Sequence, residues 1–320
     1  MTSKERVIRT LNFKKPDRVP FNFWMDRRLL SRYENELGDN FRVTYYGADV
    51  IESFPLLDWP MGNYVERDGS LWFTEPILKD WGKVDELPMP DPNDPKVYDD
   101  IMTKLRRFPD AAIFLNIPGP LCVLHFIRLL DNVYYDMYDN PRELHKLIRK
   151  IFDIQNEVIK NVINLPITAL YLQDDVACSY GLMASKPMLD EFVFDYFMEG
   201  IEMAKKAGKP VVMHSDGKVM DILDKIIEIG INAINPLQNE FNDFNEFKDK
   251  YHGKLAVYGG LENTKVIPDG TVNDVIRHVE EVFETLGKEG GLIMSSHDIP
   301  LHCPRENIEA MVEAIKKCTY

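Results

Sequence analysis

The chain has 320 residues, with 38 basic and 52 acidic side chains, and its net charge of −14 argues against nucleic acid or an anionic membrane surface as a main partner. Four scattered cysteines without paired spacing exclude a disulfide scaffold and favour a reducing compartment. No apolar run reaches the roughly 20 residues that a membrane span needs, so we expect a cytoplasmic protein.

The first predicted element is a charged N-terminal helix, in which Thr2 and Glu5 have the spacing of a capping box. Two short apolar segments come next, at 19–24 (VPFNFW) and 47–53 (GADVIES), and we expect each to be a strand. Residues 55–95 are rich in proline and contain three of the four tryptophans. We interpret them as an excursion, with a short hairpin, over the mouth of a barrel; an ordinary surface loop is the alternative.

From residue 111 onward, short apolar runs alternate with helical patterns, which is typical of βα units around a parallel sheet. The clearest helical stripe lies in 141–164, and the last helices end at glycines suited to C-caps. The strand candidates are residues 111–119, 167–175, 210–217, 231–238, 254–262 and 291–298. Together with the two earlier segments they predict one (β/α)8 TIM barrel domain spanning residues 1–320, with the excursion at its mouth.

Polar side chains come after every predicted strand of this second part of the chain. In a parallel barrel these ends meet on one face, where active sites are assembled. Some polar ending is trivial, because any strand must finish in soluble residues. The strand-end residues are Asn116, Asp174, Asp175, His214, Asp216, Asn235, Gln238, Glu262, Asn263, His297 and Asp298.

His214, Asp216 and His297 form the sharpest group among these residues. His214 and Asp216 lie two residues apart and point to the same side, and nitrogen and carboxylate ligands are ordinary for zinc. Three protein ligands and one open position would make a catalytic site. The same spacing also allows a simple hydrogen-bonded His–Asp pair. Asp174 and Asp175 are candidates for a general base, a substrate anchor or the N-terminal charge of the next helix.

Several stretches together resemble the uroporphyrinogen decarboxylase-like superfamily. They are TSKERVIRTLNFKKPDRVPF, QDDVACSYGLMASKPMLDEFV, VVMHSDGKVMDILDKIIEIGINAINPLQ, YGGLENTKVI and SSHDIPLHCPRENIEAMVEAI. The resemblance covers essentially the whole chain and implies a (β/α)8 barrel. It also implies one of two chemistries, which are cofactor-free decarboxylation of a porphyrinogen and methyl transfer involving a corrinoid protein or a thiol, with zinc at the barrel mouth.

The resemblance to the methyltransferase branch assigns the zinc ligands to His214, Asp216 and His297, where that branch has H-x-C and a later cysteine. A His-Asp-His set leaves a more Lewis-acidic ion than one with two thiolates. We therefore predict a methyltransferase that moves a methyl group from a small O- or N-methylated donor to the cobalt of a corrinoid. The aromatic residues of the N-terminal part suit an aryl methyl ether or a methylammonium group.

A corrinoid-binding D-x-H-x-x-G signature is absent from the sequence, so the cobalamin is expected on a partner protein. We expect Asp174, Asp175 and His214 to be catalytic. Cys303, just before Pro304 at the start of the last helix, is given a structural role, although it is also a possible softer ligand. The residues expected to bind substrate are Trp24, Asn116, Tyr180, Gln238 and Glu262.

Two alternatives remain open. The decarboxylases carry a motif resembling M-R-Q-A-G-R, whereas this chain reads FWMDRRLLSRYENELG and keeps only Arg27 and Arg28 as a basic pair. A substrate with eight carboxylates also needs a cationic cleft, which the net charge of −14 makes hard to arrange. The second alternative, from another class, is a non-catalytic carrier barrel whose strand-end groups only hold a ligand.

Overall fold

The computed structural model describes residues 1–67 and 70–320. In these residues seven parallel strands form one curled sheet, in the order β1-β4-β5-β8-β9-β10-β11. Each strand is a short apolar run of the kind that predicts a buried parallel strand. The strands are β1 (Val50–Ser53), β4 (Ala112–Pro118), β5 (Ala169–Gln173), β8 (Val211–His214), β9 (Ala233–Asn235), β10 (Ala256–Leu261) and β11 (Leu292–Ser296). All seven were predicted from the sequence.

The segment VPFNFW, with Met25 after it, takes the eighth position of the barrel without forming a continuous strand. Phe21 forms a β-bridge with Met294 of β11, and Met25 forms one with Ile299, just beyond β11. On its other side, the backbone N–H of Asp49 donates to the carbonyl of Phe21 at 2.8 Å. The segment thus closes the ring between β11 and β1. The architecture is a TIM barrel, as the alternating pattern predicted.

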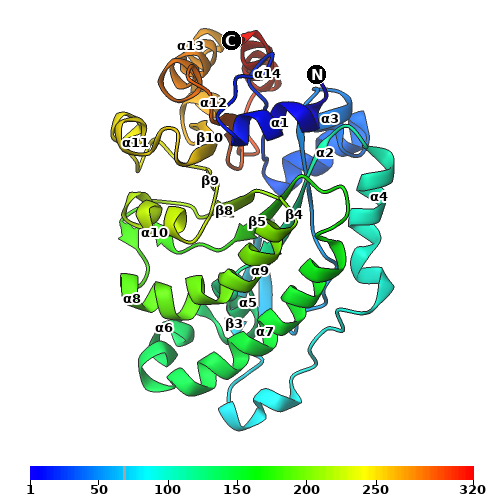
Figure 1. The fold of residues 1–320 in the computed structure, drawn as a ribbon, viewed down its shortest axis with the longest axis vertical. Helices are drawn as coiled ribbons and strands as arrows, with labels where there is room; N and C mark the ends of the chain where they lie inside the picture. The colour runs from blue at the N-terminus through cyan, green and yellow to red at the C-terminus, as the bar shows by residue number, and fades with distance from the viewer. Residues whose placement is uncertain (68–69) are drawn as a thin grey trace.

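Helices surround the sheet (Figure 1), and both termini lie at the same end of the molecule. The predicted capping box of α1 is confirmed, with the Thr2 side chain accepting from the Glu5 N–H and Glu5 accepting from the Thr2 N–H. The helices are α1 (Ser3–Leu11), α2 (Arg27–Leu37), α3 (Phe41–Thr44), α4 (Asp99–Arg107), α5 (Pro120–Arg128), α6 (Leu130–Asp139), α7 (Pro141–Val162), α8 (Lys186–Leu189), α9 (Asp195–Lys206), α10 (Leu223–Glu228), α11 (Phe244–Tyr251), α12 (Val266–Asp269), α13 (Val272–Val282) and α14 (Arg305–Lys317).

Two apolar cores result from this arrangement, because successive side chains of a strand point to opposite faces. The larger core lies between the sheet and the helices. The smaller core fills the barrel and includes Phe114, Tyr171 and Tyr258, packed with Val7 and Leu11 of α1. Helix α1 therefore belongs to the interior core, which leaves the end with the strand carboxyl termini for a site.

The excursion at 55–95 contains the predicted hairpin, formed by the antiparallel strands β2 (Asn63–Arg67) and β3 (Ser70–Glu75). Phe73 packs on the rings of His125 and Phe126, so the hairpin lies against α5. Helix α5 begins at the carboxyl end of β4, which is the end of the barrel that carries the strand-end residues. A second small hairpin, β6 (Ala177–Cys178) with β7 (Gly181–Leu182), comes after β5.

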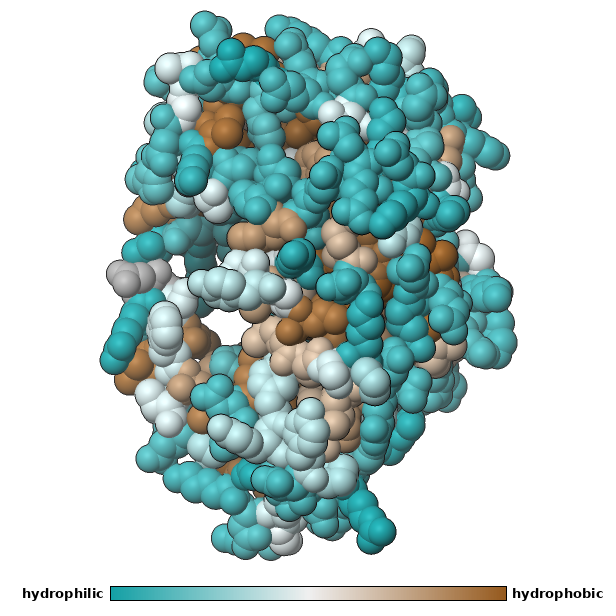
Figure 2. Space-filling model, turned by 90° about the vertical axis from the view of Figure 1, so that its left-hand side faces the viewer, coloured by the Kyte–Doolittle hydropathy of each residue, from teal (hydrophilic) through white to brown (hydrophobic). Residues whose placement is uncertain are grey.

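The surface seen in Figure 2 is largely hydrophilic, with hydrophobic residues gathered beside a hollow at mid-height. Several large apolar side chains of the β2–β3 hairpin are exposed, with Trp72 at 58%. Among the described residues, none of the helices combines the length and the apolar character that a bilayer crossing would require.

Candidate metal centre at the barrel mouth

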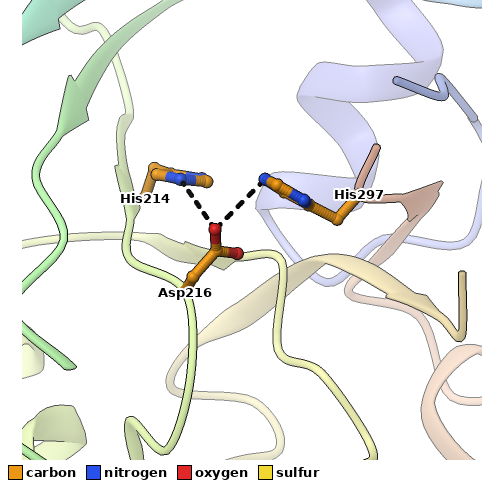
Figure 3. Close-up of side chains that lie close together, drawn as sticks. All are labelled: His214, Asp216 and His297. Atoms are coloured by element: carbon orange, nitrogen blue, oxygen red, sulfur yellow. Dashed lines mark ion pairs between the residues drawn. The ribbon is translucent and has the colours of Figure 1, made fainter. Parts of the chain in front are cut away.

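His214, Asp216 and His297 meet at the carboxyl ends of β8 and β11. His214 is the last residue of β8, Asp216 lies in the turn after it, and His297 comes directly after β11. The Asp216 carboxylate points between the two imidazoles (Figure 3), with Oδ2 lying 3.2 Å from His297 Nε2 and 4.0 Å from His214 Nε2. The two imidazole rings are roughly parallel, with centroids 5.7 Å apart.

This group has the dimensions and the chemistry of a metal site. One potential ligand atom from each residue lies within 4.8 Å of the other two. Bonds of 2.0 to 2.2 Å in tetrahedral geometry place zinc ligands about 3.4 Å apart, which lies between the two distances to Asp216. Asp216 Oδ1 is buried and has no hydrogen-bond partner among the described residues, so this oxygen is available to a ligand.

The three side chains differ in burial. His214 is 7% exposed, whereas His297 and Asp216 are 27% and 32% exposed. Burial lowers the pKa of His214, but the negative charges of Asp216 and Asp175 outweigh burial and leave this pKa raised. The group is therefore electron-rich and open on one side, as a catalytic metal site must be.

A cavity of about 210 Å³ opens beside the group. Aromatic rings form much of its wall, and the described lining contains no lysine or arginine. Burial, the largest cause, raises the pKa of Asp298. The lining consists of Trp24, Phe54, Asn116, Tyr171, Gln173, His214, His297 and Asp298.

Buried polar atoms without partners occur in the barrel interior, and one of them, Asn116 Oδ1, belongs to the cavity lining. Glu52 Oε2, Asn116 Oδ1 and Asn22 Oδ1 have no hydrogen-bond partner among the described residues. Tyr258 donates to Glu52 Oε1 at 2.6 Å and accepts from Asn22 at 2.8 Å. Burial raises the pKa of Glu52 to about 7. Such atoms are expected where a protein binds a polar ligand or water.

Of the two aspartates proposed as bases, Asp174 uses both carboxylate oxygens to accept backbone N–H groups. Its carboxylate accepts the N–H groups of Leu121 and Cys122 at 3.1 and 2.7 Å, at the start of α5. Burial raises its pKa to about 7. Asp175 lies at the site instead, because its Oδ1 is 3.5 Å from His214 Nε2 and accepts the Asp216 N–H at 3.0 Å.

The residues expected to bind substrate are only partly brought together. Trp24 and Asn116 line the cavity. Tyr180 is 94% exposed and does not line it. Gln238 accepts the N–H of Gly217 and so supports the turn that carries Asp216.

Two further strand-end residues have local roles. Glu262 accepts backbone N–H groups of Thr264, Lys265 and Val266 at the start of α12. Cys303 is buried, with its thiol directed at the carbonyls of Ile267 and Pro304, and it is not part of the metal group.

Sequence reasoning did not select Glu52, Phe54, Tyr171 or Gln173 as site residues. Each lies on β1 or β5 or directly after it, at a position with the inward-facing side-chain parity of its strand. Two features of the sequence could have pointed to these residues. One is the carboxylate within the apolar run VIES, and the other is the pair of polar groups at alternating positions in ALYLQ. Attention to strand ends alone therefore misses the layer of side chains just inside the barrel.

The fold and the site define a TIM barrel protein with a metal-capable group at the mouth. Residues 62–318 match the model of the family described as Uroporphyrinogen decarboxylase (URO-D), and the chain belongs to this family of enzymes. A curated uroporphyrinogen decarboxylase from Christiangramia forsetii is 22% identical over 258 residues, which cover 77% of this chain and 72% of that protein.

Solved structures agree on the fold. A methyltransferase from Methanosarcina mazei superposes with a TM-score of 0.70 at 16% identity, covering 98% of both chains. An endo-β-1,4-xylanase from Gloeophyllum trabeum gives a TM-score of 0.52 at 10% identity, covering 96% of this chain and 99% of that one. At these identities the likeness shows the barrel, and the site must supply the argument for activity.

Proposed function

We propose that this protein is a zinc-dependent methyltransferase that moves a methyl group from a small O- or N-methylated donor to the cobalt of a corrinoid on a partner protein. The observation that carries the proposal is the convergence of His214, Asp216 and His297 beside a small cavity. A solved methyltransferase with the same fold adds support.

The three residues would hold the zinc through two imidazole nitrogens and one carboxylate oxygen. When bound there, zinc would act as a Lewis acid toward the oxygen or nitrogen that carries the methyl group. Trp24 and Phe54 offer apolar surface to the body of the donor, and the cavity holds it in one orientation. The guanidinium of Arg42, which is not part of the cavity lining, lies over the Trp24 ring, 4.9 Å from its centroid.

Decarboxylation of a porphyrinogen is the alternative, and the family match favours it as a class. The cavity argues against it. A volume of about 210 Å³ is below the range of about 300 to 1,000 Å³ that drug-sized ligands occupy, and a tetrapyrrole is larger than such ligands. The described lining also lacks the lysines or arginines that would pair with substrate carboxylates.

Metal analysis and a transfer assay test the proposal together. The purified protein is expected to bind about one zinc per chain, as a structural or catalytic site does. With a corrinoid protein reduced to its cob(I)alamin form and a panel of methyl ethers and methylamines, methylcobalamin formation is followed by its absorbance. His297→Ala should abolish both zinc binding and transfer. His302→Ala is the matched control, because His302 is exposed and pairs with Asp269 on the surface.

Full methyl transfer by a zinc-free preparation would contradict the proposal. Release of carbon dioxide from a porphyrinogen, unaffected by chelation, would support the decarboxylase instead.

A further inference from the structure

Asn235, the last residue of β9, contacts His214 beneath the metal group. His214 Nδ1 lies 2.6 Å from Asn235 Oδ1, and the Tyr171 hydroxyl donates to the same oxygen at 2.7 Å. Asn235 Nδ2 donates to the backbone carbonyl of Tyr258 at 2.5 Å. Asn235 is 2% exposed, so water does not compete for these bonds.

These contacts fix which nitrogen of His214 carries a proton. The carbonyl of Tyr258 can only accept, so the NH₂ group of Asn235 must face it, and the amide oxygen must face His214. The oxygen of a side-chain amide, likewise, can only accept a hydrogen bond. His214 Nδ1 must therefore be the donor, which leaves the lone pair of a neutral imidazole on Nε2. This is the atom that faces Asp216 and Asp175.

We propose that Asn235 is a positioning residue for the metal centre, which holds His214 as the Nδ1–H tautomer and directs Nε2 at the metal. The inference rests on the proposed function for the identity of the metal. A hydrogen-bond acceptor behind a metal-bound histidine fixes the ring and raises the basicity of the ligating nitrogen. Tyr171 and the Tyr258 carbonyl fix Asn235 in turn, so the ligand is oriented before a metal arrives.

The tautomer can be measured directly in the chelated, natural protein. Two-bond proton–nitrogen correlation spectra at alkaline pH are expected to show His214 protonated at Nδ1 only, with His214→Gln identifying its signals. A neutral His214 protonated at Nε2 would overturn the inference, whether or not the protein binds zinc.

Zinc affinity gives the second measurement. Asn235→Ala removes the acceptor and should weaken zinc binding about 10- to 100-fold in a competition titration with a chromophoric chelator. Asn235→Asp keeps an acceptor and should bind zinc within about threefold of the natural protein or more tightly. Asn307→Ala is the matched control, because it removes the hydrogen bonds that another buried asparagine donates to the carbonyls of Ile267 and Gly270, outside the metal group; it should change zinc affinity less than about threefold.

A merely structural role for Asn235 predicts that Asn235→Ala lowers stability while zinc affinity stays unchanged, and this result would overturn the inference. If Asn235→Ala fails to fold, the zinc affinity of Asn235→Asp and the tautomer of His214 in the natural protein test the inference instead. Failure of the natural protein to bind zinc would contradict the proposed function and leave the tautomer as the test of Asn235.

Discussion

Asp216 and His297, which follow β8 and β11, differ in role from Asp174 and Glu262, which follow β5 and β10. The Asp216 and His297 side chains face each other, and His297 lines the cavity. After β5 and β10, Asp174 and Glu262 turn to the backbone N–H groups at the start of α5 and α12. The same residue type at the same kind of position thus faces a candidate ligand site in one place and caps a helix in another.

The difference follows from which side chain has the start of a helix within reach. Asp174 reaches α5, which follows the neighbouring strand β4, and Glu262 reaches α12, which begins at Val266. A helix that begins close by presents unpaired N–H groups, and a nearby carboxylate satisfies them. The segments after His214 and His297 lead to α10 at Leu223 and α14 at Arg305, and the side chains of Asp216 and His297 face each other instead. A carboxylate or imidazole at these ends remains free for a ligand.

Replacing a ligand should have the largest effect and should leave stability nearly unchanged. Asp216→Ala is expected to weaken zinc binding at least about 100-fold, because a ligand counts for more than the outer groups whose loss costs about 10- to 100-fold. Competition titration measures the affinity, and chemical denaturation of the metal-free protein measures stability. Asp221→Ala, an exposed carboxylate on the same segment, is the control and should change neither. Unchanged zinc affinity in Asp216→Ala would remove Asp216 from the metal site.

The opposite pattern is expected at the end of β5. Asp174→Asn turns one acceptor of two backbone N–H groups into a donor, in a fully buried position. We expect the free energy of unfolding to fall by about 1 to 3 kcal/mol, with zinc affinity unchanged. Denaturant titration of the metal-free proteins checks the first part. Normal stability with lost transfer activity would instead assign Asp174 to catalysis.

The last prediction concerns Glu52 of β1 and depends on pH. Because its pKa is raised from about 4.5 to about 7 in the folded protein, its contribution to stability is full at acidic pH and is lost as the pH rises through 7. Glu52→Gln cannot titrate and keeps an oxygen for the Tyr258 hydroxyl. The variant should gain stability relative to the natural protein between about pH 5 and about pH 8, measured by parallel denaturation curves. A difference that is constant over this range would show that Glu52 titrates normally.

The sequence was sufficient to predict the barrel and the proximity of the three candidate ligands, for a simple physical reason. Parallel strands share a direction, so the residues at their carboxyl ends lie on one face wherever the apolar runs are recognised. His214 and Asp216 are close in sequence, and His297 ends another strand, so their proximity results from topology.

The roles of Asp174 and Glu262 could not be predicted in the same way. They depend on which helix start lies beside the side chain, which for Asp174 is that of α5 after the neighbouring strand β4. Helix boundaries are also the least certain part of a pattern. The orientation of Asn235 also escaped prediction, since it requires the Tyr258 carbonyl, which is distant in sequence and adjacent only in the folded barrel.

The segment that closes the barrel makes more main-chain hydrogen bonds on its β11 side than on its β1 side. Toward β11 it makes repeated backbone bonds, including Asn22 N–H to Met294 O and Ile299 N–H to Trp24 O. Toward the β1 side, among the described residues, one backbone bond joins Asp49 to Phe21. Trp24 and Phe54 flank this sparse seam and line the cavity. These two aromatic side chains of the cavity wall therefore lie at the seam with the fewest main-chain hydrogen bonds, and a smaller side chain at position 54 would alter the cavity without removing a bond of the ladder of parallel strands.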